Sequence, residues 1–596
     1  MAQASKINAG KLDFRRFFIT ALLSLSALGV LLRLGTAWEF SLINNGCNNM
    51  LAPPVVSDLH TYIKLGQEIA RGVFPKEFYY QPFYYAVFLP VIYLCTNFSI
   101  WAVAVIQALL GGATVFLAGL TGKELFGKTA GLFAALLTAI STPLLLYAPF
   151  HQNETLQCFN LTLLFYLLLK ALRKKTLFLW AAVGLGAGIA TLTRGNILLF
   201  MPLLLAALWL IRHLSAKKKV LFSSAMIVIF AAVQLPFAFY NTRARGVLTG
   251  PSTAADAVLA LGNTPQAPPG GRDAGLPAGP MEYPESFHTF MAKTTQGISV
   301  PKQMIQWMRR EPGAFFELQF RKLLLFWDGR ELPNNVSLYG EGEHSKILQL
   351  LLPGRSYCLL ALAIAGMFYF ARSFRTSAQK SRWYLYGFVL LYWGAIAVFY
   401  ILSRFRAPIL PLTAVFAGAF ASVLLQRWKK WTREQKGMWF FCCVAGIFFA
   451  VSAYDWYADR VEKNAMRLFR PHGTLIEGGV LDNGPFTCGA WTPAPLKSGT
   501  KLKKRFDVVA GNGKVKWQLF SPGGRILFTV NGKEFIREIP ENGKAFIEFE
   551  CPAEFEIEIL DAPENCFAAF DRRRDYGRSE LNGEVLSGEW VMTFFY

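Results

Sequence analysis

The sequence predicts a polytopic α-helical membrane protein with a small β domain at its C-terminal end, and three observations support this fold class. First, 53% of the 596 residues are hydrophobic and only 17% are charged. Second, apolar runs of about 20 residues recur through residues 1–454, each long enough to cross a hydrocarbon core of about 30 Å as a helix. Third, from about residue 480 the pattern changes to short alternating runs that are typical of strands.

The distribution of charge indicates the topology. The formal net charge is +22, and the basic residues cluster in short connections such as 170–175, 212–219 and 427–436. These clusters recur at every second connection, as the positive-inside rule expects of cytoplasmic loops. The charge is therefore an orientation signal and not a nucleic-acid footprint, and no nucleic-acid partner is predicted.

This map predicts about eleven membrane-spanning helices, with the amino end cytoplasmic and the C-terminal domain outside. The predicted spans are 17–37, 100–121, 129–147, 155–172, 177–193, 196–211, 220–239, 353–371, 384–402, 407–426 and 437–454. Residues 83–96 form a further apolar stretch that is shorter than a typical span. Arg33 lies near the outer end of the first span and no small-residue cleavage site follows it cleanly, which favours an uncleaved anchor.

The chain divides into a membrane unit and an exported domain. Residues 1–454 form the membrane unit, with a first outer loop at 38–99 and a large Pro- and Gly-rich outer loop at 240–352. Residues 455–479 are a polar linker, and residues 480–596 are predicted to form an extracytoplasmic β domain, a sandwich of antiparallel strands.

Turn residues and cysteines add detail to the β domain. The Gly-Gly and Asn-Gly pairs at 523–524, 531–532 and 542–543 predict hairpin-type turns. Cys551 and Cys566 form a candidate disulfide in an oxidising compartment. The sequence has no CxxC motif, so a structural zinc site has no support.

The segment PPVVSDLHTYIKLGQEIARGVFPKEFYYQPFYY, residues 53–85, is the most unusual polar stretch. Asp58 begins a helical pattern in which apolar side chains recur, so it falls in the first turn of a helix. One interpretation is a helix cap or a dipole partner. The other is a functional acid, because the segment follows a predicted span and precedes the aromatic run FYYQPFYY, whose rings belong to an interfacial belt or stack on a sugar.

A second polar segment, YAPFHQNETLQ, contains His151 and Glu154, predicted to stand one helical turn apart on the same side of the membrane as Asp58. Such a pair binds metal in some proteins, and the alternative is capping at the start of a span. Two carboxylates in one outer cavity, Asp58 and Glu154, would form a candidate acid/base pair.

A third set is cationic and lies at outer turns, where the positive-inside rule disfavours arginine. It consists of Arg194, Arg243, Arg245, Arg404 and Arg406. The planar guanidinium fork suits a lipid phosphate, and the alternative is snorkelling to ordinary anionic headgroups. Several together favour the phosphate.

At this point the chain resembles a known family. The segments that carry the likeness, in chain order, are SDLHTYIKLGQEIARG, YYQPFYY, FGKTAGLFAALLTAISTPLLLY, GIATLTRGNILLFMP, LALGNTP and SRFRAPILPLTAVFAG. In this order they resemble the polyprenyl-phosphate-sugar-dependent glycosyltransferases of the GT-C type. The most similar subset is the bacterial branch related to protein O-mannosyltransferases and the lipid A aminoarabinose transferase. The likeness runs through about residues 10–430 and leaves out the β domain.

The resemblance implies a GT-C fold and an inverting transfer of a sugar from a lipid-linked phosphate to an acceptor outside the cytoplasmic membrane. It implies that Asp58 is the catalytic base and that Glu154 is the second acid, which binds the acceptor or positions a metal. The first loop has no Asp-x-Asp pair, so a divalent cation is left open and no metal ligands are assigned. YQP stands here in place of the HPP of many protein mannosyltransferases, which weakens the interpretation that the acceptor is a protein.

The remaining site residues follow from the same resemblance. Those expected to bind the donor or the acceptor are Lys76, Tyr79, Tyr80, Gln81, His151, Arg194, Arg243, Arg404 and Arg406. The arginines and Lys76 would hold the departing polyprenyl phosphate, and the tyrosines and Gln81 would line the sugar site. A further hypothesis places Trp327 and Glu331, in FWDGRELPNN, near the donor.

The function predicted is therefore an inverting glycosyltransferase in a bacterial inner membrane. Its partners are a polyprenyl-phosphate-linked sugar donor, an envelope acceptor (lipid, glycan or protein) and the bilayer. The alternatives are a multi-pass transporter, a glycan polymerase or ligase, and an assembly protein that docks through its β domain. A transporter would carry ionisable groups or helix breaks near mid-membrane in paired halves.

Overall fold

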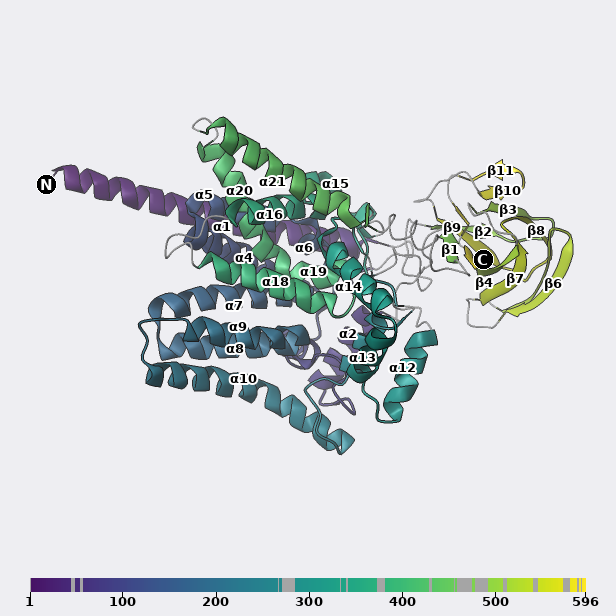
Figure 1. Ribbon diagram of the computed structural model, residues 1–596, viewed down its shortest axis with the longest axis horizontal. Coiled ribbons are helices and arrows are strands. Elements are labelled where there is room, and N and C mark those ends of the chain that lie inside the picture. The colour runs from purple at the N-terminus through teal and green to yellow at the C-terminus, as the bar shows by residue number, and fades with distance from the viewer. Residues whose placement is uncertain are drawn as a thin grey trace.

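The structure is a computed structural model. It describes residues 2–43, 49–53, 57–265, 267–270, 285–332, 334–338, 341–371, 381–427, 431–454, 456–457, 474–477, 491–506, 512–521, 523–539, 545–571, 579–586, 589–590 and 592–595. All described helices lie between Ala2 and Val451, and all described strands lie from Thr474 onward. The predicted fold class, a polytopic helical protein with a C-terminal β domain, is confirmed (Figure 1).

The first helices run from the amino end to the start of the large loop. They are α1 Ala2–Ser41, α2 Asp58–Ala70, α3 Leu89–Thr96, α4 Ile100–Phe126, α5 Lys128–Ile140, α6 Thr142–Leu146, α7 Glu154–Lys174, α8 Leu177–Thr193, α9 Met201–Trp209 and α10 Ala216–Arg245. A π-helical segment, Phe83–Phe88, leads into α3, and a 3₁₀ segment, Gly195–Phe200, leads into α9.

The large loop is itself helical, and further long helices follow it. The helices are α11 Ala255–Gly262, α12 Glu285–Thr295, α13 Val300–Arg310, α14 Pro312–Trp327, α15 Lys346–Leu350, α16 Ser356–Phe370, α18 Arg382–Ala397, α19 Ser403–Arg406, α20 Leu410–Arg427 and α21 Arg433–Val451. Short 3₁₀ segments lie at Glu341–His344, Leu352–Gly354 and Ala407–Ile409.

Six of the described helices are long and apolar enough to cross a membrane. They are Arg16–Ser41, Ile100–Phe126, Glu154–Lys174, Ala216–Arg245, Ser403–Gln426 and Arg433–Val451. Four of the other predicted spans overlap shorter apolar helices and the fifth, 384–402, overlaps α18, so the count of eleven stays a prediction. The domain boundaries at 454 and 479 also stay predictions.

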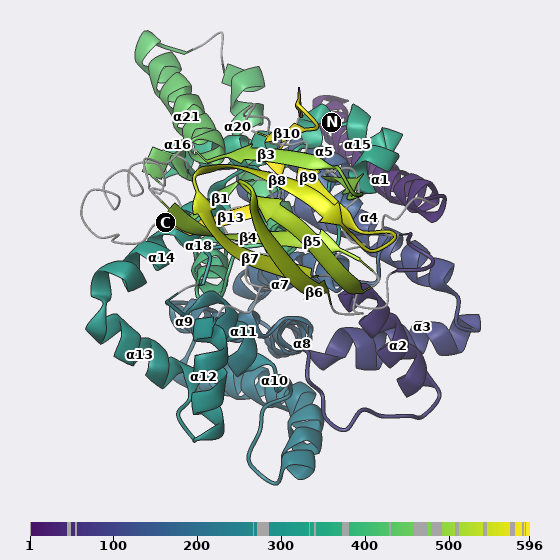
Figure 2. The same ribbon diagram turned by 90° about the vertical axis from the view of Figure 1, so that its right-hand side faces the viewer.

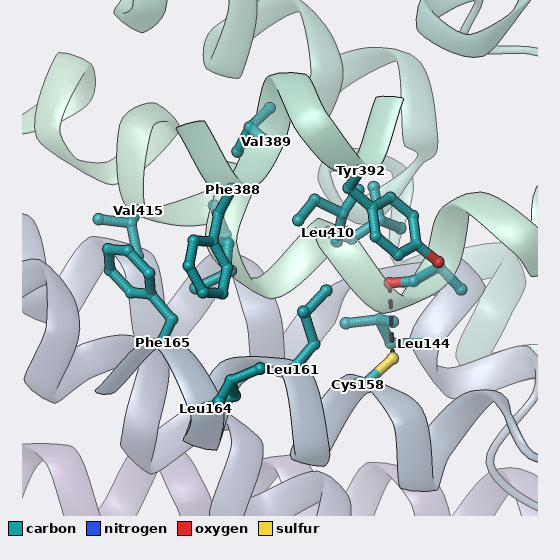
Figure 3. Close-up of a cluster of buried hydrophobic side chains, with 14 of the residues drawn as sticks. Leu144, Cys158, Leu161, Leu164, Phe165, Phe388, Val389, Tyr392, Leu410 and Val415 are labelled. Carbon is teal, nitrogen blue, oxygen red and sulfur yellow. Dashed lines mark hydrogen bonds between the residues drawn. The ribbon is translucent and has the colours of Figure 1, made fainter. Parts of the chain in front are cut away.

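The helical core is a continuous apolar cluster between α7, α18 and α20. Figure 3 shows Leu161, Leu164 and Phe165 of α7 facing Phe388 and other side chains of α18 and α20. At one edge of this cluster the Cys158 thiol donates a hydrogen bond to the Ala407 carbonyl at 3.4 Å. This packing fixes the amino end of α20 against α7, which decides where the arginines of α19 lie.

Close helix approach at small residues also shapes the bundle. A Cβ atom on Gly418 of α20 would lie 2.4 Å from the backbone nitrogen of Ala134 in α5. Small residues at such crossings let two backbones pack directly, which is a main source of association between membrane helices.

We therefore predict that Gly418→Ala lowers the free energy of unfolding by about 1–3 kcal/mol, because backbone atoms cannot yield as a flexible side chain can. Thermal unfolding in detergent measures the loss. Gly394→Ala in α18 is the matched control, since a Cβ there meets nothing within 4 Å. An equal melting temperature for Gly418→Ala and wild type would contradict the prediction.

The β domain consists of two antiparallel sheets. Its strands are β1 Thr474–Glu477, β2 Trp491–Pro495, β3 Lys501–Arg505, β4 Asn512–Phe520, β5 Gly524–Val530, β6 Lys533–Ile539, β7 Ala545–Pro552, β8 Glu554–Asp561, β9 Phe567–Asp571, β10 Ser579–Leu581, β11 Glu584–Val585, β12 Glu589–Trp590 and β13 Met592–Phe595. One sheet has the order β1-β13-β4-β9-β12, with β2 on β9 and β7 on β4; the other has the order β11-β10-β3-β8-β5-β6. Inward side chains of both sheets share one core, in which the rings of Phe528 and Phe549 lie 5.9 Å apart. The unit is a sandwich, as predicted.

The turn predictions had mixed outcomes. The Asn531-Gly532 pair joins β5 to β6 with φ of 50° and 82°, the two positive values that a type I′ hairpin needs. The Gly-Gly pair at 523–524 is not in a hairpin, because β4 and β5 belong to different sheets. The pair at 542–543 lies outside the described residues. Cys551 and Cys566 are separate buried thiols, so the predicted disulfide is wrong for this structure.

Candidate active site

The residues after Ser57 form α2, and the start of this helix separates the two interpretations of Asp58. The Ser57 side chain caps the helix by accepting a hydrogen bond from the His60 backbone N–H at 3.1 Å. Because Ser57 does the capping, the Asp58 carboxylate is available for other contacts. Its place in the first turn still matches the positive end of the helix dipole.

The Asp58 carboxylate meets two groups from distant parts of the chain. Arg404 Nη1 lies 2.9 Å from Asp58 Oδ2, and Asn335 Nδ2 donates to the same oxygen at 2.9 Å. The side chain of Asp58 is 29% exposed and that of Arg404 is 11% exposed. This ion pair is thus partly shielded from water, where charge pairs interact more strongly than at an open surface.

Glu154, at the start of α7, forms the second ion pair. Arg194 Nη2 lies 3.0 Å from Glu154 Oε1, and Glu154 is 1% exposed. The two ion pairs share the ring of Phe405: the guanidinium carbon of Arg194 lies 4.5 Å from its centroid and that of Arg404 lies 5.1 Å from it. The face of an aromatic ring attracts a cation electrostatically, so the Phe405 ring helps to position both guanidinium groups. The structure therefore brings Asp58, Glu154, Arg194 and Arg404 to one end of the helical bundle.

Aromatic side chains of α2 and of the segment that follows it lie near Asp58. Tyr62, one turn after Asp58 in α2, packs edge-on against Tyr80 with ring centroids 5.8 Å apart. Burial, assisted by the Asp58 carboxylate, holds the pKa of Tyr62 well above its usual range, so its phenol stays neutral. Gln81 lies against Gly195, the first residue of the 3₁₀ segment after α8, since a Cβ on Gly195 would lie 2.7 Å from Gln81 Nε2.

Buried polar atoms without hydrogen-bond partners occur at Glu154 and at residues close in sequence to Glu154 or to its partner Arg194. Within the described part of the chain, this holds for both ring nitrogens of His151, both amide atoms of Gln152 and of Asn196, and Glu154 Oε2. Buried polar groups are normally paired, and an exception calls for water or a ligand. A small cavity of about 10 Å³, room for about one water, adjoins Glu154, Arg33 and other side chains.

His151 and Glu154 do not form the predicted one-turn pair, because α7 begins only at Glu154 and His151 lies in the irregular segment before it. His151 instead stacks on Tyr93, with ring centroids 6.4 Å apart. Among the described residues no group of three His, Cys, Asp or Glu side chains is placed to hold a metal ion.

Burial lowers the pKa of His151 to about 3. Between pH 6.5 and pH 3 the unfolded chain therefore binds a proton that the folded protein does not, and folding stability falls as pH falls through this window. We predict a loss of about 1.4 kcal/mol per pH unit from this group. Comparison of melting temperatures at pH 7 and pH 5 for wild type and His151→Phe measures it, with exposed His213→Gln as the control. A pH slope that is unchanged in His151→Phe would contradict the prediction.

The other predicted site residues lie elsewhere or have other partners. Arg406 donates to the carbonyls of Phe326, Asp328 and Arg330, so its guanidinium binds backbone and is not directed to a phosphate. Its neighbour Ser403 accepts a further bond at 3.2 Å. The Phe326 carbonyl lies in the last turn of α14, where carbonyls have no partner within the helix, and the other two belong to the segment that follows α14.

Lys76 and Arg243 are exposed at the edge of the site, and Tyr79 is 41% exposed. Tyr79 packs edge-on against Tyr80, with ring centroids 4.9 Å apart. An unpredicted pair lies beside them, with Arg245 Nη2 2.9 Å from Glu77 Oε1. Trp327 and Glu331 were the two residues expected near the donor. Trp327 packs in the apolar core, and the Glu331 carboxylate accepts a hydrogen bond from the Leu338 backbone N–H.

Sequence reasoning missed four residues of the site. Asn335, Phe405, Gln152 and Asn196 were not among the residues predicted to act there. Phe405 stands between the two arginines of SRFR, and that aromatic position was the signal available for it. Asn335 had no signal, because it is 277 residues from Asp58.

Comparison with known proteins gives one family match. Residues 80–237 match the family of dolichyl-phosphate-mannose-protein mannosyltransferases. No curated protein matches the chain. The family match confirms, over this part of the chain, the predicted resemblance to mannosyltransferases that use a lipid-phosphate-linked sugar, and six described helices are long and apolar enough to cross a membrane.

Solved structures of such enzymes are similar at low identity. The archaeal oligosaccharyltransferase AglB from Archaeoglobus fulgidus, in complex with an inhibitory peptide and a dolichol-phosphate, is 15% identical with a TM-score of 0.42, over 77% of this chain and 58% of that chain. ArnT from Cupriavidus metallidurans, bound to undecaprenyl phosphate, is 13% identical with a TM-score of 0.37, over 72% of this chain and 62% of that chain. The arabinosyltransferase EmbB from Mycobacterium smegmatis is 11% identical with a TM-score of 0.28, over 95% of this chain and 64% of that chain. This chain thus spans about three fifths of the length of each.

Proposed function

We propose that this protein transfers a sugar from a polyprenyl-phosphate donor to an envelope acceptor, with inversion, on the outer face of a bacterial inner membrane. The donor class rests on the matched family, whose description names a dolichyl-phosphate-linked sugar. The observation that carries the proposal is the contact of Arg404 with Asp58 at 2.9 Å. It puts a cation that suits phosphate directly beside a carboxylate that suits a base.

In the proposed reaction Asp58 takes the proton of the acceptor hydroxyl. The acceptor oxygen forms a bond to C1 of the sugar from one face, while the bond from C1 to the phosphate oxygen breaks on the other. The electron pair stays on the leaving polyprenyl phosphate. Arg404 stabilises this developing charge, and its Nε, which has no hydrogen-bond partner among the described residues, adds a donor for the phosphate.

Glu154 and Arg194 are proposed to hold the polar part of the substrates. The unpaired buried atoms of His151, Gln152 and Asn196 supply hydrogen-bond donors and acceptors beside them. A sugar with several hydroxyl groups would satisfy atoms that otherwise lie buried without partners. Tyr62 and Tyr80 provide an apolar wall on the side of Asp58.

The proposal is tested by incubating the purified protein with a panel of polyprenyl-phosphate monosaccharides and an extract of envelope acceptors. We expect one donor to be consumed and its label to appear in a product that identifies the acceptor. If the folded protein consumes no monosaccharide donor, the proposal fails. Consumption of a lipid-linked oligosaccharide instead would identify a glycan polymerase or ligase, and uptake of a labelled solute into proteoliposomes would identify a transporter.

A further inference from the structure

A cavity in the large loop lies outside the site described above. It has a volume of about 320 Å³ and lies between α12 and α13, the two helices that Figure 2 shows beside α11. Lys293 of α12 and Arg310 of α13 line it from the two sides, and Gln306 and Trp307 lie between them along α13. A volume of this size accommodates a small ligand such as a monosaccharide.

The polar groups of this cavity favour an anionic, hydroxyl-rich ligand. Two lining residues are cations, and the single lining acid is Glu311, which accepts a hydrogen bond from Trp307 Nε1 at 3.4 Å. Gln303 is 3% exposed and its Nε2 donates to the carbonyls of Phe290 and Ile298, both at 2.9 Å. Its Oε1 is buried with no donor among the described residues, so it offers an acceptor to a ligand hydroxyl.

The cavity is connected to the candidate active site through one apolar layer. Phe290, which lines the cavity, belongs to a buried cluster with Tyr400 and Leu402, against which Phe405 packs. Phe405 is the ring that carries the guanidinium groups of Arg194 and Arg404. A ligand in the cavity would thus be held beside the segment that supplies the proposed phosphate ligand.

We infer that this cavity binds an acceptor saccharide through an anionic substituent, a phosphate or a carboxylate on the sugar. Lys293 and Arg310 pair with the anion, and Gln303 and Gln306 bind hydroxyl groups. The assignment of this sugar as the acceptor rests on the proposed function. The binding of an anionic sugar to the cavity does not rest on the proposed function, because binding is measured without catalysis.

The test uses the full chain in nanodiscs of phosphatidylcholine and glucose 6-phosphate as the probe, with binding measured by calorimetry. Lys293→Gln/Arg310→Gln removes both cations of the cavity. Lys302→Gln/Arg309→Gln is the matched control, because it removes two exposed cations of α13 that do not line the cavity. We expect the first double variant to weaken the Kd at least about tenfold and the control to leave it unchanged. Glucose should bind more weakly than glucose 6-phosphate, and so should inorganic phosphate.

Equal binding by wild type and both double variants would overturn the inference. So would inorganic phosphate binding as tightly as glucose 6-phosphate, which would mark a plain anion site. Loss of probe binding when phosphatidylglycerol replaces phosphatidylcholine would assign the cavity to a lipid headgroup and also overturn it. Donor consumption by the same preparations is assayed separately: probe binding without donor turnover keeps the sugar site and rejects the proposed function. Donor turnover without probe binding keeps the proposed function and rejects the sugar site.

Discussion

Asp58→Asn is expected to lower kcat for sugar transfer by about 10³-fold, because the amide keeps the size of the carboxylate but cannot take the acceptor's proton. The cap of α2 belongs to Ser57, so the helix should still form. Steady-state kinetics with the donor identified in the panel measures the effect, and melting temperatures of both proteins verify folding.

Glu68→Gln is the matched control for this result. Glu68 lies on the same helix, and its partly exposed side chain reaches Lys64 at 4.0 Å. Its loss should leave kcat within about twofold of wild type, since solvent-accessible pairs of this kind contribute little. Equal turnover by Asp58→Asn and wild type would return Asp58 to the role of a dipole partner. The transferase assignment would then need another base.

Arg404→Gln is the second change with a large expected effect. Removing the guanidinium should lower kcat by about 10²- to 10³-fold, because the leaving phosphate loses a donor that acts mainly in the transition state. Arg404→Lys should recover part of this loss, since it restores the charge but not the planar fork. The split between kcat and KM for the donor distinguishes transition-state stabilisation from uniform binding.

Arg245→Gln provides the comparison for Arg404. It also breaks an arginine–carboxylate pair, with Glu77, but one whose arginine side chain is 42% exposed and which lies at the edge of the site. We expect a change of less than about threefold in kcat, because exposed ion pairs contribute little. If Arg404→Gln raises only KM, its role is donor binding and not stabilisation of the leaving group.

Features that depend on neighbouring residues could be predicted from the sequence. Apolar runs located the helices, and the helical spacing after Ser57 placed Asp58 in a first turn, where the structure has it. The Asn531-Gly532 turn was predictable because both residues tolerate positive φ. The glycine pair at 523–524 was misread because a flexible turn says nothing about which sheet the next strand joins.

The sequence by itself determined the class of protein, the course of its helices and the chemical types at the site, because periodicity, charge bias and turn preference act over a few residues. Only the tertiary structure decided which acid meets which cation. Arg404 reaches Asp58, whereas Arg406, two residues on, binds the backbone after α14, because the packing of α20 on α7 turns the two side chains to different neighbours. Asn335 joins them because the course of the large loop, and no local pattern, returns it to α2.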